Sequence, residues 1–170
     1  MRTSLLLTLF LAASGACRTP VRIVDAATDA EAAALLGRLK QLEGVWELRV
    51  PGAPPTSTVF SIGAGGSIVR ETMMPGDKGE MTNVYHMDGA SLVMTHYCGA
   101  GNQPRMRATS SDGHTMAFVF EGATDLQSGE HCMGSMTLMF INPDTVAQEW
   151  MHHDPSGPGD TVRFMLARKK

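Results

Sequence analysis

Hydrophobic and polar residues alternate with a period of two along most of the chain after residue 44. This period is typical of half-buried β-strands. It predicts ten strands, near residues 45–50, 57–62, 67–72, 80–87, 91–98, 105–110, 114–121, 133–141, 145–152 and 161–168. Asp88-Gly89 and Asp112-Gly113 separate predicted strands, and Asp-Gly between alternating segments is a strong hairpin signal. Further turns are expected at Asn142–Asp144 and over Asp154–Asp160.

A single helix is expected before the first strand. Thr28 and Glu31 are spaced as in a capping box, where the threonine side chain accepts from the Glu31 backbone N–H and the glutamate reaches back. The apolar face that follows has leucines four and three residues apart: Leu35, Leu39 and Leu42. Gly44 is expected to end the helix, since glycine commonly stands just past a helix C-terminus.

The predicted elements indicate an all-β domain. No second helix is long enough for the crossover connections that parallel strands require, so the strands are expected to be antiparallel. Short antiparallel strands joined by tight turns form a sandwich or a closed barrel. Residues 28–170 have the size of one domain with one core. We expect an antiparallel up-and-down barrel of about 8–10 strands with one N-terminal helix.

The first residues have the three parts of a secretory signal. Arg2 stands before the apolar run Leu5–Ala13, and the small residues Ser14–Ala16 lead to Cys17. The run is too short to cross a bilayer, which needs about 20 residues. We therefore expect a signal peptide over residues 1–16, a tether over residues 17–27, and export to the periplasm.

The segment Ser14–Cys17 resembles the lipobox of bacterial lipoproteins, although leucine is commonest where Ser14 stands. The resemblance implies that Cys17 is lipidated and holds the domain at a membrane surface. Cleavage by ordinary signal peptidase is the alternative, because Ser14 and Ala16 also suit that enzyme.

Composition and charge exclude two classes of protein. The net charge is -3 and no basic run precedes Arg168–Lys170, which argues against a nucleic-acid partner. A hydrophobic content of 43% excludes a disordered chain. The sequence lacks the motifs of serine hydrolases, zinc proteases and nucleotide-binding enzymes, so we name no catalytic residue and no cofactor.

The two ends of the predicted barrel resemble those of the lipocalin superfamily. Gly44-Val45-Trp46 begins the first strand and Arg168 ends the last one. The resemblance implies a lipocalin-like barrel in which Arg168 lies across the indole of Trp46, a cation–π contact of about 0.5–2 kcal/mol. Three further segments are similar to a family of exported bacterial proteins of unknown function with lipocalin-like folds: Val84–Gly89, Thr95–Cys98 and Gly101–Met106.

The hairpin around Asp88-Gly89 has one face that is more apolar than the other. We place it inside the barrel; it carries Met81, Asn83, Tyr85, Met87, Leu92, Met94, His96 and Cys98. A few polar groups among apolar ones are typical of a ligand pocket. The proposed lining is completed by Phe118, Gln148 and Trp150, and the expected ligand is a small apolar molecule. The alternative is that the polar groups satisfy one another in a packed core.

The remaining cysteines and basic residues support weaker hypotheses. Cys98 and Cys132 are a candidate disulfide in an oxidising compartment, with buried free thiols as the alternative. Four residues could ligate a metal ion: His96, Cys98, His131 and Cys132. Their spacing matches no known motif of a structural metal site, so no metal site is predicted. Arg105 and Arg107 alternate with Met106 and are expected to point outward; pointing inward, they would indicate an acidic ligand.

Two other functions stay open at this point. One is a haem-binding barrel resembling nitrobindin, whose axial histidine lies near the C-terminus. Val162–Lys170 contains no histidine, so His96 or His152 would have to replace it. The other is a cofactor-free enzyme, such as a cyclase or isomerase, that uses Tyr85, His96 and Glu71.

Overall fold

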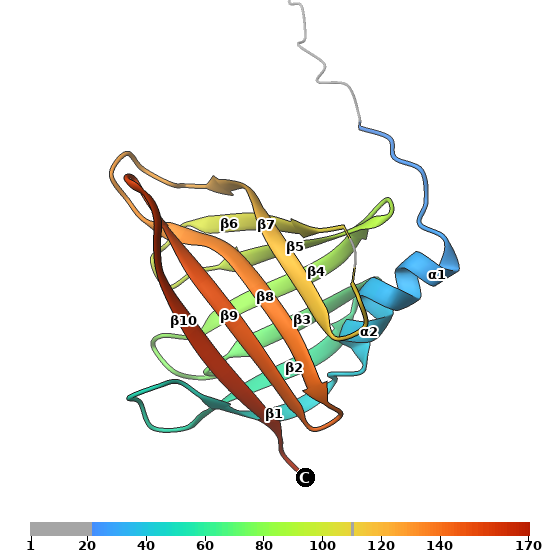
Figure 1. The fold of residues 1–170 in the computed structure, drawn as a ribbon, viewed down its shortest axis with the longest axis horizontal. Helices are drawn as coiled ribbons and strands as arrows, with labels where there is room; N and C mark the ends of the chain where they lie inside the picture. The colour runs from blue at the N-terminus through green and yellow to red at the C-terminus, as the bar shows by residue number, and fades with distance from the viewer. Residues whose placement is uncertain (1–21, 110) are drawn as a thin grey trace, which may run out of the picture.

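The computed structural model describes residues 22–109 and 111–170, and its main feature is a closed antiparallel barrel (Figure 1). Its ten strands are β1 (Gly44–Arg49), β2 (Thr56–Gly63), β3 (Ile68–Met73), β4 (Met81–Asp88), β5 (Ser91–Tyr97), β6 (Gln103–Ala108), β7 (Thr115–Thr124), β8 (Cys132–Asn142), β9 (Thr145–Asp154) and β10 (Gly157–Arg168). Each strand pairs with the next along the chain, and β10 returns to pair with β1. The predicted up-and-down barrel is confirmed. Cys17 and the residues of the expected signal peptide lie outside the described residues.

The turn predicted over Asp154–Asp160 is too long: β9 ends at Asp154 and β10 begins at Gly157. The ladder between β9 and β10 continues to the pair Gly157↔Asp154, with a register shift between Pro158 and Thr161. Two glycines permit this. Gly157 has a φ of 126°, in the region that favours glycine. At Gly159 a Cβ would lie 2.5 Å from Asp154 Oδ2 and 3.1 Å from His152 Cβ, so a larger residue there would require the Asp154 side chain to move.

One continuous helical segment precedes the barrel, composed of α1 (Asp29–Ala32), η1 (Ala33–Gly37) and α2 (Arg38–Lys40). The predicted capping box is present, with the Glu31 backbone N–H donating to Thr28 Oγ1 at 3.3 Å. The expected end at Gly44 is wrong: the helix stops at Lys40, and Gly44 begins β1 with a φ of 125°. A short 3₁₀ turn, η2 (Ala64–Gly66), joins β2 to β3. Within the part of the chain described, no helix has the length and apolar character that a membrane crossing requires.

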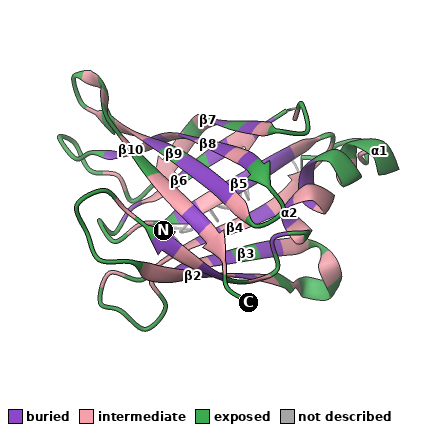
Figure 2. Ribbon diagram, turned by 60° about the horizontal axis from the view of Figure 1, so that its bottom comes forward, coloured by how far each residue is buried: buried purple, intermediate pink, exposed green. Residues whose placement is uncertain are grey.

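The helix closes one end of the barrel with its leucine face. This face is buried and belongs to the same core as the barrel interior; it consists of Leu35, Leu36 and Leu39, and Leu42 just after the helix extends it. Figure 2 shows buried and less buried positions alternating along the strands, as expected when one face of a closed sheet lines the core. The interior holds many large side chains that are at most 1% exposed, among them Phe60, Phe118, Met73, Met94, Met106 and Met116.

Trp46 and Arg168 hold the helix, the first strand and the last strand together. They are directly paired between β1 and β10. The Arg168 guanidinium lies 4.3 Å from the Trp46 ring centroid, as the lipocalin resemblance implied. Arg168 also donates to the backbone oxygens of Glu43 at 2.9 Å and Gln41 at 2.7 Å, and Trp46 Nε1 donates to Leu42 O at 2.7 Å. This arrangement seals the helix-covered end.

Candidate functional site

A network of buried polar side chains crosses the middle of the barrel. Cross-strand pairing creates one row of it, because Glu71 on β3 lies opposite Asn83 on β4, which lies opposite His96 on β5. Paired residues on the same face of a sheet contact one another. The rest of the network is Tyr85 on β4 and Gln148 with Trp150 on β9, and all six side chains are at most 1% exposed.

Glu71 is the centre of this network. Its Oε2 accepts from Asn83 Nδ2 and from the Tyr85 hydroxyl, both at 2.8 Å. Its Oε1 accepts from Gln148 Nε2 at 2.7 Å. Because β9 lies four strands away from β3 around the barrel, that bond crosses the interior. Trp150 Nε1 in turn donates to Gln148 Oε1 at 3.2 Å.

His96 ends the network with a nitrogen that has no partner. Its Nδ1 lies 2.7 Å from Asn83 Oδ1. Since Asn83 uses its amide nitrogen on Glu71, its oxygen faces the imidazole, and an oxygen of this kind only accepts. Nδ1 therefore carries the proton and Nε2 has a free lone pair. Nε2 is buried without a hydrogen-bond partner among the described residues.

Burial controls the protonation of the network. Burial raises the pKa of Glu71, and the hydrogen bonds from Asn83, Tyr85 and Gln148 oppose that rise. Burial lowers the pKa of His96 to about 4, so the ring is neutral at pH 7. Burial and the charge of Glu71 raise the pKa of Tyr85 well above its usual range. Tyr85 therefore keeps its proton and donates it.

The residues predicted to line a pocket come together in the structure. Asn83, Tyr85 and His96 belong to the network, as do Gln148 and Trp150. Its apolar neighbours include Met94 and Phe118, which are buried, whereas Met81 is half-buried. The ring of Trp150 lies 4.9 Å from that of His96, and Tyr85 lies 5.8 Å from Phe118. Their role in ligand binding stays a prediction.

The sequence predicts Glu71 only as an acid–base partner of His96, whereas in the structure it is the centre of the network. The two side chains do not bond directly, because Asn83 lies between them. One signal was available: Glu71 alternates with Val69 and Met73, which are both buried on the inner face of β3. An acidic residue in such a row points into a core.

The most clearly formed hollows in the described part of the molecule have no residue of this network in their linings. One of about 410 Å³ lies beside the helix-covered end, with Arg38, Phe140 and Arg168 in its lining. Arg168 already donates to backbone oxygens there, so this hollow belongs to the closure of the barrel. A ligand would reach His96 only through movement of the side chains that fill the interior.

The cysteines and histidines near the other end form no recognisable metal site. Cys98 and Cys132 are free thiols in the structure, and burial together with the charge of Cys98 raises the pKa of Cys132. Their disulfide stays a prediction. His131 and His152 stack with centroids 5.9 Å apart. Within residues 22–109 and 111–170, no group of three or more His, Cys, Asp or Glu is arranged to hold a metal ion.

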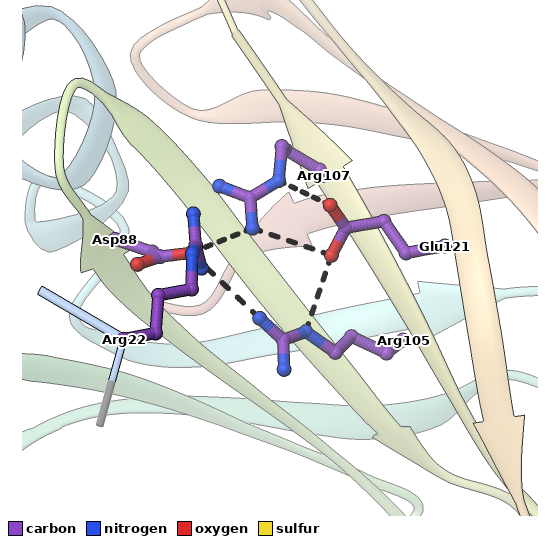
Figure 3. A network of polar contacts seen from close by, with 5 residues as sticks. All are labelled: Arg22, Asp88, Arg105, Arg107 and Glu121. Carbon is purple, nitrogen blue, oxygen red and sulfur yellow. Dashed lines mark hydrogen bonds and ion pairs between the residues drawn. The ribbon is translucent and has the colours of Figure 1, made fainter. Parts of the chain in front are cut away.

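Arg105 and Arg107 lie on the outer wall, as expected, in an ion-pair cluster (Figure 3). Arg107 pairs with Glu121 and, at 2.6 Å, with Asp88; Arg105 pairs with Glu121 at 3.2 Å. Arg22, in the segment before the helix, joins the cluster through Asp88 at 2.5 Å. Hydrogen bonds from Arg107 and Arg22 lower the pKa of Asp88 to about 2. The cluster attaches the segment around Arg22 to the wall, and its arginines are not available to a ligand inside the barrel.

Comparison with known proteins adds no assignment. No protein-family model matches the chain, and no curated protein matches it significantly.

Proposed function

We propose that the protein is a binding protein for a small, mostly apolar molecule, which it holds in the barrel interior against His96. The observation that carries this proposal is the buried, unpartnered lone pair of His96 Nε2. Buried polar atoms nearly always have a hydrogen-bond partner. Leaving one without a partner costs about 1–3 kcal/mol, which a ligand that supplies the partner recovers.

The surroundings of His96 suit an apolar ligand. Apart from the network, the interior consists of aromatic and aliphatic side chains and methionines. Each ligand methylene moved from water into such surroundings contributes about 0.8 kcal/mol. The network then fixes the orientation of the ligand through one polar contact, a combination typical of small-molecule sites.

Flexible methionines support access to the site. Met73 contacts the network directly, with its sulfur 3.8 Å from Asn83 Nδ2. Met81 is its cross-strand partner on β4 and is half-buried. Unbranched thioether side chains change rotamer readily and adapt to irregular ligands. We propose that they move aside when the ligand enters.

We further propose that the protein acts outside the cytoplasm, tethered to a membrane through lipidated Cys17. Support comes from the signal-like first residues and from the lipobox resemblance of Ser14–Cys17. The contact between Arg22 and Asp88 would then hold the barrel close to its anchor.

Titration of the purified protein with N-phenyl-1-naphthylamine tests the proposal. This neutral, apolar fluorophore carries one N–H that can donate to His96. We expect a saturable rise in fluorescence and about tenfold weaker binding by His96→Leu, from the loss of one buried hydrogen bond. His114→Leu is the matched control, because His114 is exposed. Equal affinities of the two variants, or no saturable binding by the unmodified protein, would contradict the proposal.

A further inference from the structure

We infer that the ligand of this site is an apolar molecule with a positively charged amine at its polar end, and not a fatty acid. The inference rests on the proposed binding function and adds the chemistry of the ligand head. It follows from the direction of the hydrogen bonds in the network and from the charges that the interior contains.

Trp150, at the opposite end of the network from His96, determines which groups in it donate hydrogen bonds and which accept them. An indole N–H only donates, so Trp150 obliges Gln148 to present its oxygen to the indole and its nitrogen to Glu71. Tyr85 donates its hydroxyl hydrogen to the same carboxylate, as does the amide of Asn83. All donors therefore converge on Glu71, and three donated hydrogen bonds favour its ionised form, against the burial that raises its pKa.

The assignment of donors and acceptors determines which ligand group can bind to His96. With the Asn83 oxygen facing Nδ1, the ring proton lies on Nδ1 and Nε2 offers only a lone pair. A ligand atom beside Nε2 has to donate a hydrogen bond. An ammonium group does so, whereas an ionised carboxylate would present lone pairs to a lone pair.

The charge of the interior favours the same ligand. Glu71 is the one carboxylate among the described buried residues, and these include no lysine or arginine. Arg105 and Arg107 pair with carboxylates on the outer wall. An ammonium at His96 supplies a counter-charge near Glu71, with Asn83 bridging the two. The neighbouring ring of Trp150 adds an aromatic surface, which attracts cations.

Calorimetric titration of the whole protein with octylamine, octanol and octanoate at pH 7 tests the inference, because the three share one chain and differ in the head. We expect octylamine to bind about tenfold or more tightly than octanoate, with octanol between them, since an unpaired buried group costs about 1–3 kcal/mol. Octanoate binding as tightly as octylamine overturns the inference and leaves the proposed function standing. If none of the three binds, the proposed function fails and the inference fails with it.

Glu71→Gln gives a sharper test, because it should reverse the polarity of the site. The new amide nitrogen needs an acceptor, which Asn83 provides by turning its oxygen toward position 71. The Asn83 nitrogen then donates to His96 Nδ1 and the ring proton moves to Nε2, while the Tyr85 hydroxyl accepts from the new amide nitrogen instead of donating to the former Oε2. We expect the preference for octylamine to disappear and octanoate to gain affinity. Glu149→Gln is the matched control, since Glu149 is exposed on β9.

Nitrogen-15 NMR of the histidine rings tests the network without any ligand. In the unmodified protein we expect the proton of His96 on Nδ1, and in Glu71→Gln on Nε2. A proton on Nε2 in the unmodified protein at pH 7 overturns the inference, since Nε2 would then donate and select an acceptor.

Discussion

Acid should destabilise this protein through His96, and the size of the effect follows from burial of the ring. Its pKa is about 4 in the folded protein, against 6.5 for an ordinary histidine. A histidine with a pKa lowered by folding stabilises the fold above the unfolded pKa, and this contribution is lost as pH falls from 6.5 through 4. At 1.36 kcal/mol per pKa unit, the loss is about 2 kcal/mol between pH 7 and pH 5 and about 3 kcal/mol by pH 4.

Comparison with His96→Gln isolates this contribution. Glu71 acts in the opposite direction, because its raised pKa gives stability that is lost as pH rises. The variant retains Glu71, so the difference in pH dependence reports His96. Urea unfolding at pH 7 and pH 5 should show that the wild type loses about 2 kcal/mol more than the variant. His114→Gln, at an exposed position, should behave as wild type. If the wild type and His96→Gln lose equal free energy of unfolding between pH 7 and pH 5, the reasoning that His96 is buried as a neutral ring is refuted.

Three further predictions concern other parts of the chain. Arg168→Ala should lower the free energy of unfolding, measured by chemical denaturation, by about 2–4 kcal/mol, because it removes a cation–π contact and two hydrogen bonds to backbone oxygens. Arg163→Ala, at an exposed position, is the control and should change it by less than about 0.5 kcal/mol. Titration of thiols in the denatured, unreduced protein from the oxidising compartment should find Cys98 and Cys132 bonded; two reactive groups would contradict the disulfide. Cys17→Ser should abolish membrane association. The intact mass of the wild-type protein should show that the chain is cleaved before Cys17 and that Cys17 carries lipid.

The parts of the fold that follow local rules could be predicted from sequence. In the β4–β5 hairpin, alternation identified the inner face, and the register Tyr85↔Met94 agrees with it. The capping box at Thr28 is equally local. The extension of the β9–β10 ladder into residues 154–160 was missed because Gly157 and Gly159 look like loop residues. Their role there depends on how closely a neighbouring strand approaches, which no single segment of sequence reveals.

Only the part of the site that depends on local strand pairing could be predicted from the sequence. Asn83 and His96 lie on one hairpin, so their proximity follows from strand pairing. Glu71 belongs to the site because of Gln148, which is 77 residues away and reaches it across the interior. An acidic side chain is ordinarily exposed. Only the closed barrel brings together enough donors to bury it.

Closure of the barrel has a consequence for how the chain folds. The pair Trp46↔Arg168 joins the first strand to the last, so a ribosome releases nearly the whole domain before the barrel can close. Contacts between residues so distant in sequence form slowly. Until then β1 and β9 expose unpaired edges, which are templates for aggregation. A chain cut short before β10 would have two free edges and no barrel.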